Sequence, residues 1–229
     1  MLAGCAGLIS VQAPAGWAQE PEVIARLAQI KSATAPAAEK TPPAVIWLNS
    51  LHPDTVQHIA PPANFTLLQK NKMFVPHLLV VPVGSSVAFP NADPFFHNVF
   101  SLFNGKRFDL GLYEAGSTRS VVFSREGVSY IFCNIHSEMS AVVIALSTPY
   151  SGLPDSQGVF HVKDVPGGDY DLHVWIEGEK QSVLDGLTRR VHVAAGVSDL
   201  GDIHIKFPEK RQHLNKFGRS YEPDTRPTY

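Results

Sequence analysis

One stretch decides the fold and the chemistry of this chain, residues 128–139, which read VSYIFCNIHSEM. Its first half is apolar and rich in β-branched and aromatic residues, and this composition predicts a strand that ends near Cys133. Its second half is short and carries His136 and Met139 in a C-x2-H-x2-M pattern. Alone, Cys133 or Met139 would be an ordinary core residue, and His136 an ordinary hydrogen-bonded polar residue. A thiol, an imidazole and a thioether together at loop spacing after a strand predict a metal site instead.

The donor set favours copper. Thiolate, imidazole and a distant thioether are the ligands of blue-copper electron-transfer sites, which use two histidines. We expect the second histidine to be His97, in the stretch DPFFHNVF at residues 93–100. The prediction is one copper ion held by His97, Cys133, His136 and Met139. Zinc is the competing metal, but methionine is a poor ligand for zinc.

Residues 74–146 resemble a cupredoxin of the plastocyanin, pseudoazurin and amicyanin group. The resemblance is carried by the pair His97-Asn98, by the amicyanin-like spacing of the loop ligands, and by VPVGSSVAFPN at residues 81–91. The whole chain is similar to the two-part bacterial cupredoxins called methylamine utilization proteins. The resemblance implies that the backbone N–H of Asn98 donates to the Cys133 sulfur and tunes the site. The group often has proline before the loop histidine, where this chain has Ile135, a difference that affects loop stiffness and removes no ligand.

Short strands separated by glycine- and proline-rich turns predict an all-β protein. We expect a cupredoxin-like antiparallel Greek-key sandwich followed by a smaller β-sandwich that resembles transthyretin-like or carboxypeptidase-regulatory domains. The second resemblance is carried by VPGGDY at residues 165–170 and by Val174-Trp175. The second sandwich is short for an independent domain, so we expect it to borrow a strand such as residues 44–48. His161, His192 and His204 alternate with apolar neighbours and are expected to face solvent.

The chain is expected to divide into five segments. An export signal that lacks a positively charged start is expected first, then a short helix from Glu20 to Ala33 with a Pro/Ala linker, then the two sandwiches, and finally a flexible basic tail. The expected ranges are 1–19, 20–43, 44–148, 149–206 and 207–229.

Composition limits the cellular setting. The net charge of the 229-residue chain is −2, which gives no indication of a nucleic-acid partner. No apolar run is long enough for a membrane-spanning helix. Membrane contact is therefore expected only if Cys5, in a sequence similar to a lipoprotein box, is lipidated. The predicted location is the periplasm or another exported compartment. The chain has two cysteines, Cys5 and Cys133. If Cys5 is removed or lipidated, no disulfide can form, and Cys133 is a free thiol unless a metal holds it.

The function predicted from these observations is electron transfer between redox protein partners, not catalysis. The sequence shows no nucleophile elbow and no phosphate-binding loop. Two alternatives remain open. A copper carrier would be expected to have more methionines than Met1, Met73 and Met139. An accessory binding module without a redox role would be expected to show a row of exposed aromatic residues, which Trp175 alone does not provide.

Overall fold

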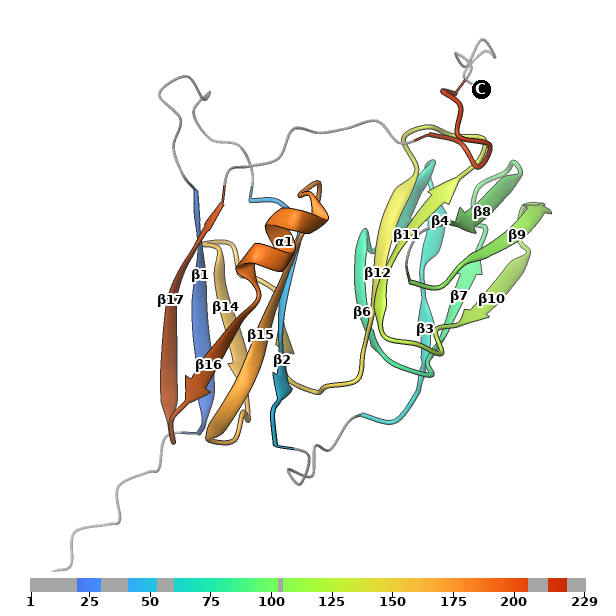
Figure 1. Ribbon diagram of the computed structural model, residues 1–229. Helices are drawn as coiled ribbons and strands as arrows, with labels where there is room; N and C mark the ends of the chain where they lie inside the picture. The colour runs from blue at the N-terminus through green and yellow to red at the C-terminus, as the bar shows by residue number, and fades with distance from the viewer. Residues whose placement is uncertain (1–19, 30–40, 53–59, 103–104, 206–213, 222–229) are drawn as a thin grey trace, which may run out of the picture.

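The computed structural model describes residues 20–29, 41–52, 60–102, 105–205 and 214–221. In these ranges the chain forms strands in two stacks of sheets that lie side by side, with one short helix (Figure 1). This arrangement confirms the predicted all-β fold. The predicted export signal at residues 1–19 lies outside the described residues.

The first stack holds the residues of the predicted copper site. Its larger sheet has the strand order β6–β12–β11–β8–β9, and its smaller sheet has the order β10–β7–β3 beside the hairpin β4–β5. Pairing is antiparallel except for β6 with β12 and β3 with β7. The strands are β3 (Asn64–Thr66), β4 (Leu68–Lys70), β5 (Met73–Val75), β6 (Leu78–Pro82), β7 (Ser86–Pro90), β8 (His97–Ser101), β9 (Phe108–Tyr113), β10 (Thr118–Val122), β11 (Gly127–Cys133) and β12 (Ser140–Leu146).

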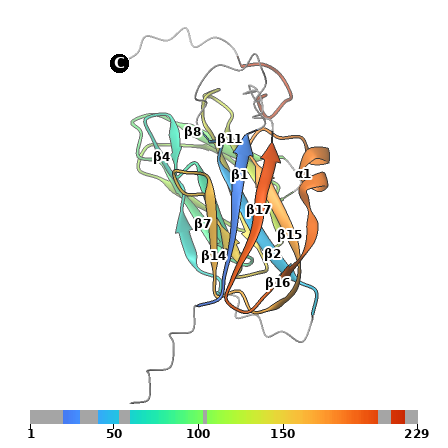
Figure 2. The same cartoon turned by 90° about the vertical axis from the view of Figure 1, so that its left-hand side faces the viewer.

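The second stack has the sheets β13–β2–β15–β16 and β14–β1–β17. Figure 2 shows the latter sheet from its outer side, with β1 and β17 in front. The helix α1 (Gln181–Leu187) buries Leu184 in the core of this stack. The strands are β1 (Glu22–Gln29), β2 (Ala44–Ser50), β13 (Ser151–Gly152), β14 (Val159–Lys163), β15 (Gly168–Ile176), β16 (Arg189–Val193) and β17 (Val197–Ile205).

The pairing of β1 and β2 bears on three sequence predictions. The helix expected from Glu20 is wrong, because residues 22–29 form the strand β1 between β14 and β17. Val23 and Ala25 are fully buried while Arg26 is exposed. The backbone of β1 is paired on both sides, which a helix could not achieve. The expectation of a borrowed strand is confirmed, because β2 pairs with β13 and β15. Because of this pairing, β2 is part of the second stack, although the first sandwich was predicted to span 44–148.

Strand β12 joins the two stacks because both of its faces are apolar. Ala141, Val143 and Ala145, at alternate positions of the strand, face the core of the first stack. Val142 and Ile144 belong to the core cluster of the second stack. Across this interface the indole N–H of Trp175 donates to the Tyr130 hydroxyl at 3.2 Å. The sheet that carries the candidate site is therefore packed on both sides, which restricts its movement.

Candidate metal centre

The ends of two neighbouring strands bring His97 and Cys133 together. His97 begins β8 and Cys133 ends β11, and Cys133 pairs in register with Val99. Both side chains are fully buried. The His97 Nδ1 lies 3.7 Å from the Cys133 Sγ. Antiparallel pairing of these strands thus places two donors, far apart in sequence, at one end of the sheet, between two of its inner strands.

The loop between β11 and β12 adds the second imidazole. The His136 Nδ1 lies 3.6 Å from the Cys133 Sγ. The loop is closed by the Cys133 N–H, which donates to the Met139 carbonyl at 3.1 Å, and by the Met139 N–H, which donates to the His136 carbonyl at 3.1 Å. Met139 is fully buried in the core cluster that contains Cys133. The four predicted residues therefore lie on one closed loop and the strand next to it.

The spacing of the donor atoms fits a bound metal ion. The ligand atoms of His97, Cys133 and His136 all lie within 4.8 Å of one another. Bonds of about 2.0 Å to nitrogen and 2.3 Å to sulfur, at angles of about 110–120°, separate the two donors by about 3.5–3.7 Å. The observed sulfur–nitrogen separations, 3.7 and 3.6 Å, match this range. Within the described part of the chain, this is the group of His, Cys and acidic residues whose geometry can hold a metal.

Asp93 orients His97 from the side away from the sulfur. The His97 Nε2 lies 3.0 Å from Asp93 Oδ2, and both side chains are almost fully buried. When the carboxylate is ionised, Nε2–H donates to it, so Nδ1 keeps its lone pair toward Cys133. Asp93 also accepts from the backbone N–H groups of Asn71, at 2.6 Å, and Lys72, at 3.0 Å. It therefore ties the β4–β5 turn to the site.

The pKa values of this pair favour the metal-binding forms. Burial lowers the pKa of His97 below its ordinary value, although the hydrogen bond and charge of Asp93 act in the opposite direction. Burial alone would raise the pKa of Asp93, but the N–H groups of Lys72 and Asn71, together with His97, outweigh it, and the net pKa is lowered. At neutral pH the pair is thus a neutral imidazole beside a carboxylate. A neutral imidazole is the form that binds metals.

Aromatic rings cover the histidines. The Phe95 ring meets the His97 ring edge-on at 5.3 Å and the His136 ring at 5.4 Å between centroids. Phe96, the next residue, is 50% exposed. Among the four predicted ligands, His136 is the one that is partly exposed, while the other three are buried. The site therefore reaches solvent near His136.

Asn98 holds the two ligand segments together by contacts that differ from the one expected. Its carbonyl accepts from the Asn134 N–H at 2.9 Å, and its side-chain amide donates to Asp109 at 2.7 Å. These bonds fix the start of the loop against β8. The expected bond from the Asn98 N–H to the Cys133 sulfur stays a prediction.

Sequence reasoning missed two neighbours of the site. Asp93 lies four residues before His97, and a carboxylate at that spacing was a usable signal. The other neighbour is the segment 214–221, which was expected to be part of a flexible tail. This expectation is corrected, because Lys216 and Tyr221 bond to the loop that carries Cys133. Residues 206–213 and 222–229 lie outside the described residues.

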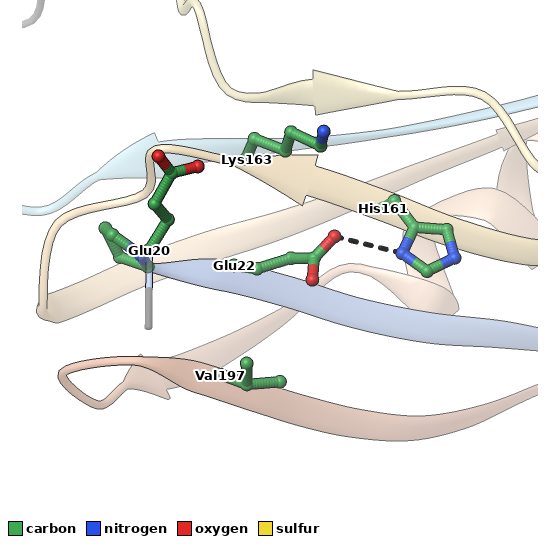
Figure 3. Close-up of a pocket in the computed structure, with 6 residues that line it drawn as sticks. Glu20, Glu22, His161, Lys163 and Val197 are labelled. Carbon is green, nitrogen blue, oxygen red and sulfur yellow. Dashed lines mark hydrogen bonds and ion pairs between the residues drawn. The ribbon is translucent and has the colours of Figure 1, made fainter. Parts of the chain in front are cut away.

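Among the residues that the structure describes, the other histidines do not form a comparable centre. His161, His192 and His204 are exposed, as their alternation predicted. Figure 3 shows an open depression where His161 of β14 faces Glu22 of β1, with Nδ1 and Oε1 3.0 Å apart. Glu20, Pro21, Lys163 and Val197 also line it. The contact between His161 and Glu22 lies at the surface, and such contacts contribute little to stability.

Comparisons with known proteins give partial likenesses. No protein-family model and no curated protein matches the chain. A copper-containing nitrite reductase from Thermus scotoductus is 23% identical over 38% of this chain and 23% of that chain, with a TM-score of 0.35. A purple cupredoxin from Nitrosopumilus maritimus is 28% identical over 37% of this chain and 99% of that one, with a TM-score of 0.33. An oxidised mutant of amicyanin is 18% identical over 36% of this chain and 81% of that chain, with a TM-score of 0.34. The chain thus spans about a quarter of the nitrite reductase. Because each TM-score is low, the fold and site are assigned from strand pairing and donor distances.

Proposed function

We propose that this chain is a copper-binding electron carrier. His97, Cys133 and His136 would provide the three strong ligands, and Met139 a weak fourth. The observation that carries the proposal is the convergence of one thiol and two imidazoles, with separations that fit metal bonds, in a buried site. Bound copper would supply a one-electron couple between Cu(I) and Cu(II).

The donor set supports copper over zinc. Both metals accept thiolate and imidazole, but a thioether suits copper. Met139 is fully buried and its backbone bonds to both Cys133 and His136. The protein therefore keeps a thioether in the metal loop even though a structural zinc site would not use one. The structure offers one group of donors in its described residues, and we propose a single mononuclear ion there.

Electron transfer is favoured over catalysis by burial. His97, Cys133 and Met139 are 0% exposed, so little space is left for a substrate beside the donors. The sheet that carries them is packed on both faces, and Asp93 and Asn98 fix both ligand segments. Such a frame keeps the ligands in place when the charge of the ion changes. Small reorganisation of this kind is what an electron carrier requires.

The partner is proposed to be another redox protein in an exported compartment. His136 is the partly exposed ligand, and its ring lies 5.4 Å from the ring of Phe95. Phe96, the next residue after Phe95, is exposed. An exposed aromatic residue beside a buried redox site is suited to a transient contact of small area. The near-neutral net charge favours such an apolar contact over binding to a nucleic acid.

Copper loading of the purified full chain tests the proposal. We expect an intense visible thiolate-to-copper band, one ion per chain, and a reversible one-electron titration. Cys133→Ala should abolish the band in a folded protein, whereas Ser137→Ala, at an exposed position of the same loop, should retain it. A colourless wild type with copper bound would reject the blue-copper assignment. Rapid loss of copper to a mild chelator, without a reversible couple, would favour a copper carrier.

A further inference from the structure

Residues 214–221, here called the C-terminal strap, form a compact turn beside the metal loop (Figure 1). Asn215 closes the turn, because its side-chain oxygen accepts from the N–H groups of Phe217, at 3.0 Å, and Arg219, at 3.1 Å. Gly218 has a φ of 72°, which favours glycine at this point of the turn. The strap thus has a conformation fixed by its own sequence.

The strap bonds to the segment that carries the thiol. The Tyr221 hydroxyl donates to the Cys133 carbonyl at 2.7 Å. The Lys216 backbone N–H donates to Asn134 Oδ1 at 3.0 Å. Cys133 and Asn134 also bond to Met139 and Asn98 through their own N–H groups. The strap therefore binds the Cys133 carbonyl and the Asn134 side chain, whereas the N–H groups of these two residues bond to Met139 and Asn98.

The same strap also holds the strand that carries His97. The Lys216 Nζ lies 2.8 Å from Asp109 Oδ2. Asp109 Oδ1 accepts from the Asn98 side chain at 2.7 Å, and Asn98 follows His97. Lys216 thus contacts the thiol segment through its backbone and the histidine segment through its side chain.

We propose that the C-terminal strap positions the metal ligands, with Tyr221 and Lys216 as its positioning residues. This inference rests on the proposed copper function. A bond to the Cys133 carbonyl limits rotation of the cysteine backbone, and so limits the directions in which the thiol can point.

The consequence is a site that keeps its geometry without metal. If the strap is released, the Cys133 carbonyl loses its partner and the loop opens more often. One neutral hydrogen bond contributes about 1 kcal/mol, which corresponds to a change of about five-fold in the open population. Labelling of a buried thiol requires such an opening, so its rate reports that population directly.

The test uses the full chain with Tyr221→Phe, which removes the hydroxyl alone, and Tyr221→Leu, which also removes the ring. Arg219→Ala is the control, because this residue is exposed and its bonds within the strap come from its backbone. In metal-free protein we expect labelling of Cys133 by an aromatic disulfide to rise about five-fold in the Phe variant and further in the Leu variant. In copper-loaded protein, release to a chelator should accelerate similarly, and the visible band and the reduction potential should shift.

The outcomes separate this inference from the copper proposal. Wild-type labelling and release rates in both folded Tyr221 variants would overturn the role of the strap, whatever the spectrum. Faster labelling with an unchanged band and potential would also overturn it, because the strap would then be a cover and not a positioning element. A wild type without a copper band would reject the copper function, while the labelling of metal-free protein would still show whether the strap restrains Cys133.

Discussion

Asp93→Asn tests how strongly a buried carboxylate supports the metal centre. Asp93 Oδ2 accepts from His97 Nε2 and the Lys72 N–H, and Oδ1 accepts from the Asn71 N–H. An asparagine can place its oxygen at one of these positions only. If the oxygen takes the Oδ2 position, the amide nitrogen faces the Asn71 N–H, which is also a donor. If the oxygen takes the Oδ1 position, the hydrogen bond from His97 is lost. The change removes at least one charge-assisted hydrogen bond from a site that is 4% exposed.

The expected magnitude follows from that bond. A hydrogen bond to a charged group contributes about 1.5–3 kcal/mol, which corresponds to about 10–100-fold in an equilibrium constant. Loss of an outer partner of a metal-bound histidine has an effect of the same size, about 10–100-fold in metal affinity. The carboxylate stabilises the more positive ion more strongly. Each tenfold preferential loss of Cu(II) affinity raises the reduction potential by about 59 mV.

The assay is a competition titration for each oxidation state, together with a potentiometric titration of the copper-loaded protein. Asp202→Asn is the control, because it removes the same charge at an exposed position on β17, in the other stack. We expect weaker Cu(II) binding and a higher potential for Asp93→Asn, and wild-type values for the control. An unchanged affinity and potential in a folded Asp93→Asn variant would refute the role given to the carboxylate.

Four further outcomes are expected. Met139→Leu should keep copper bound while the potential rises, because the oxidised ion loses a weak donor, and outright loss of copper in a metal titration would contradict this. Phe96→Glu should leave spectrum and potential nearly intact but slow electron exchange with a redox partner, and unchanged exchange kinetics would place the docking surface elsewhere. Ile144→Ala should reduce the free energy of unfolding by about 2–5 kcal/mol in urea titrations, yet leave the copper band unchanged, because this side chain packs against the second stack. The pKa of Asp109 is lowered, since its bonds to Lys216, Asn98 and Gly111 outweigh the effect of burial. The stabilisation from Asp109 is therefore present above its unfolded pKa and lost as pH falls through its folded pKa. The difference in melting temperature between wild type and Asp109→Asn should shrink on acidification, and a difference that grows would contradict the sign.

The ligand set could be predicted because its chemistry is local. Cys133, His136 and Met139 share one loop, and their residue types limit the choice of metal before any fold is known. The structure places His97 and His136 at the Cys133 sulfur, and Met139 closes the same loop. The assignment of all four as copper ligands stays a prediction. The outward direction of the three strand histidines followed from alternation alone.

The missed features depend on contacts between distant parts of the chain. Val23, Ile24 and Leu27 fit a helical spacing, but the edges of β14 and β17 pair with this segment and make it a strand. Tertiary pairing commonly overrides local preference in this way. Residues 214–221 have no periodicity, and their place beside Cys133 depends on single bonds from Lys216 and Tyr221.

X-ray absorption at the copper edge of the loaded protein tests the central claim most directly, because it counts the donors around the metal. We expect one short copper–sulfur bond and two copper–nitrogen bonds in wild type, with the sulfur contribution lost in Cys133→Ala and one nitrogen lost in His97→Ala. A first coordination sphere made of nitrogen and oxygen alone would contradict the assignment of Cys133 and, with it, the proposed electron-transfer function.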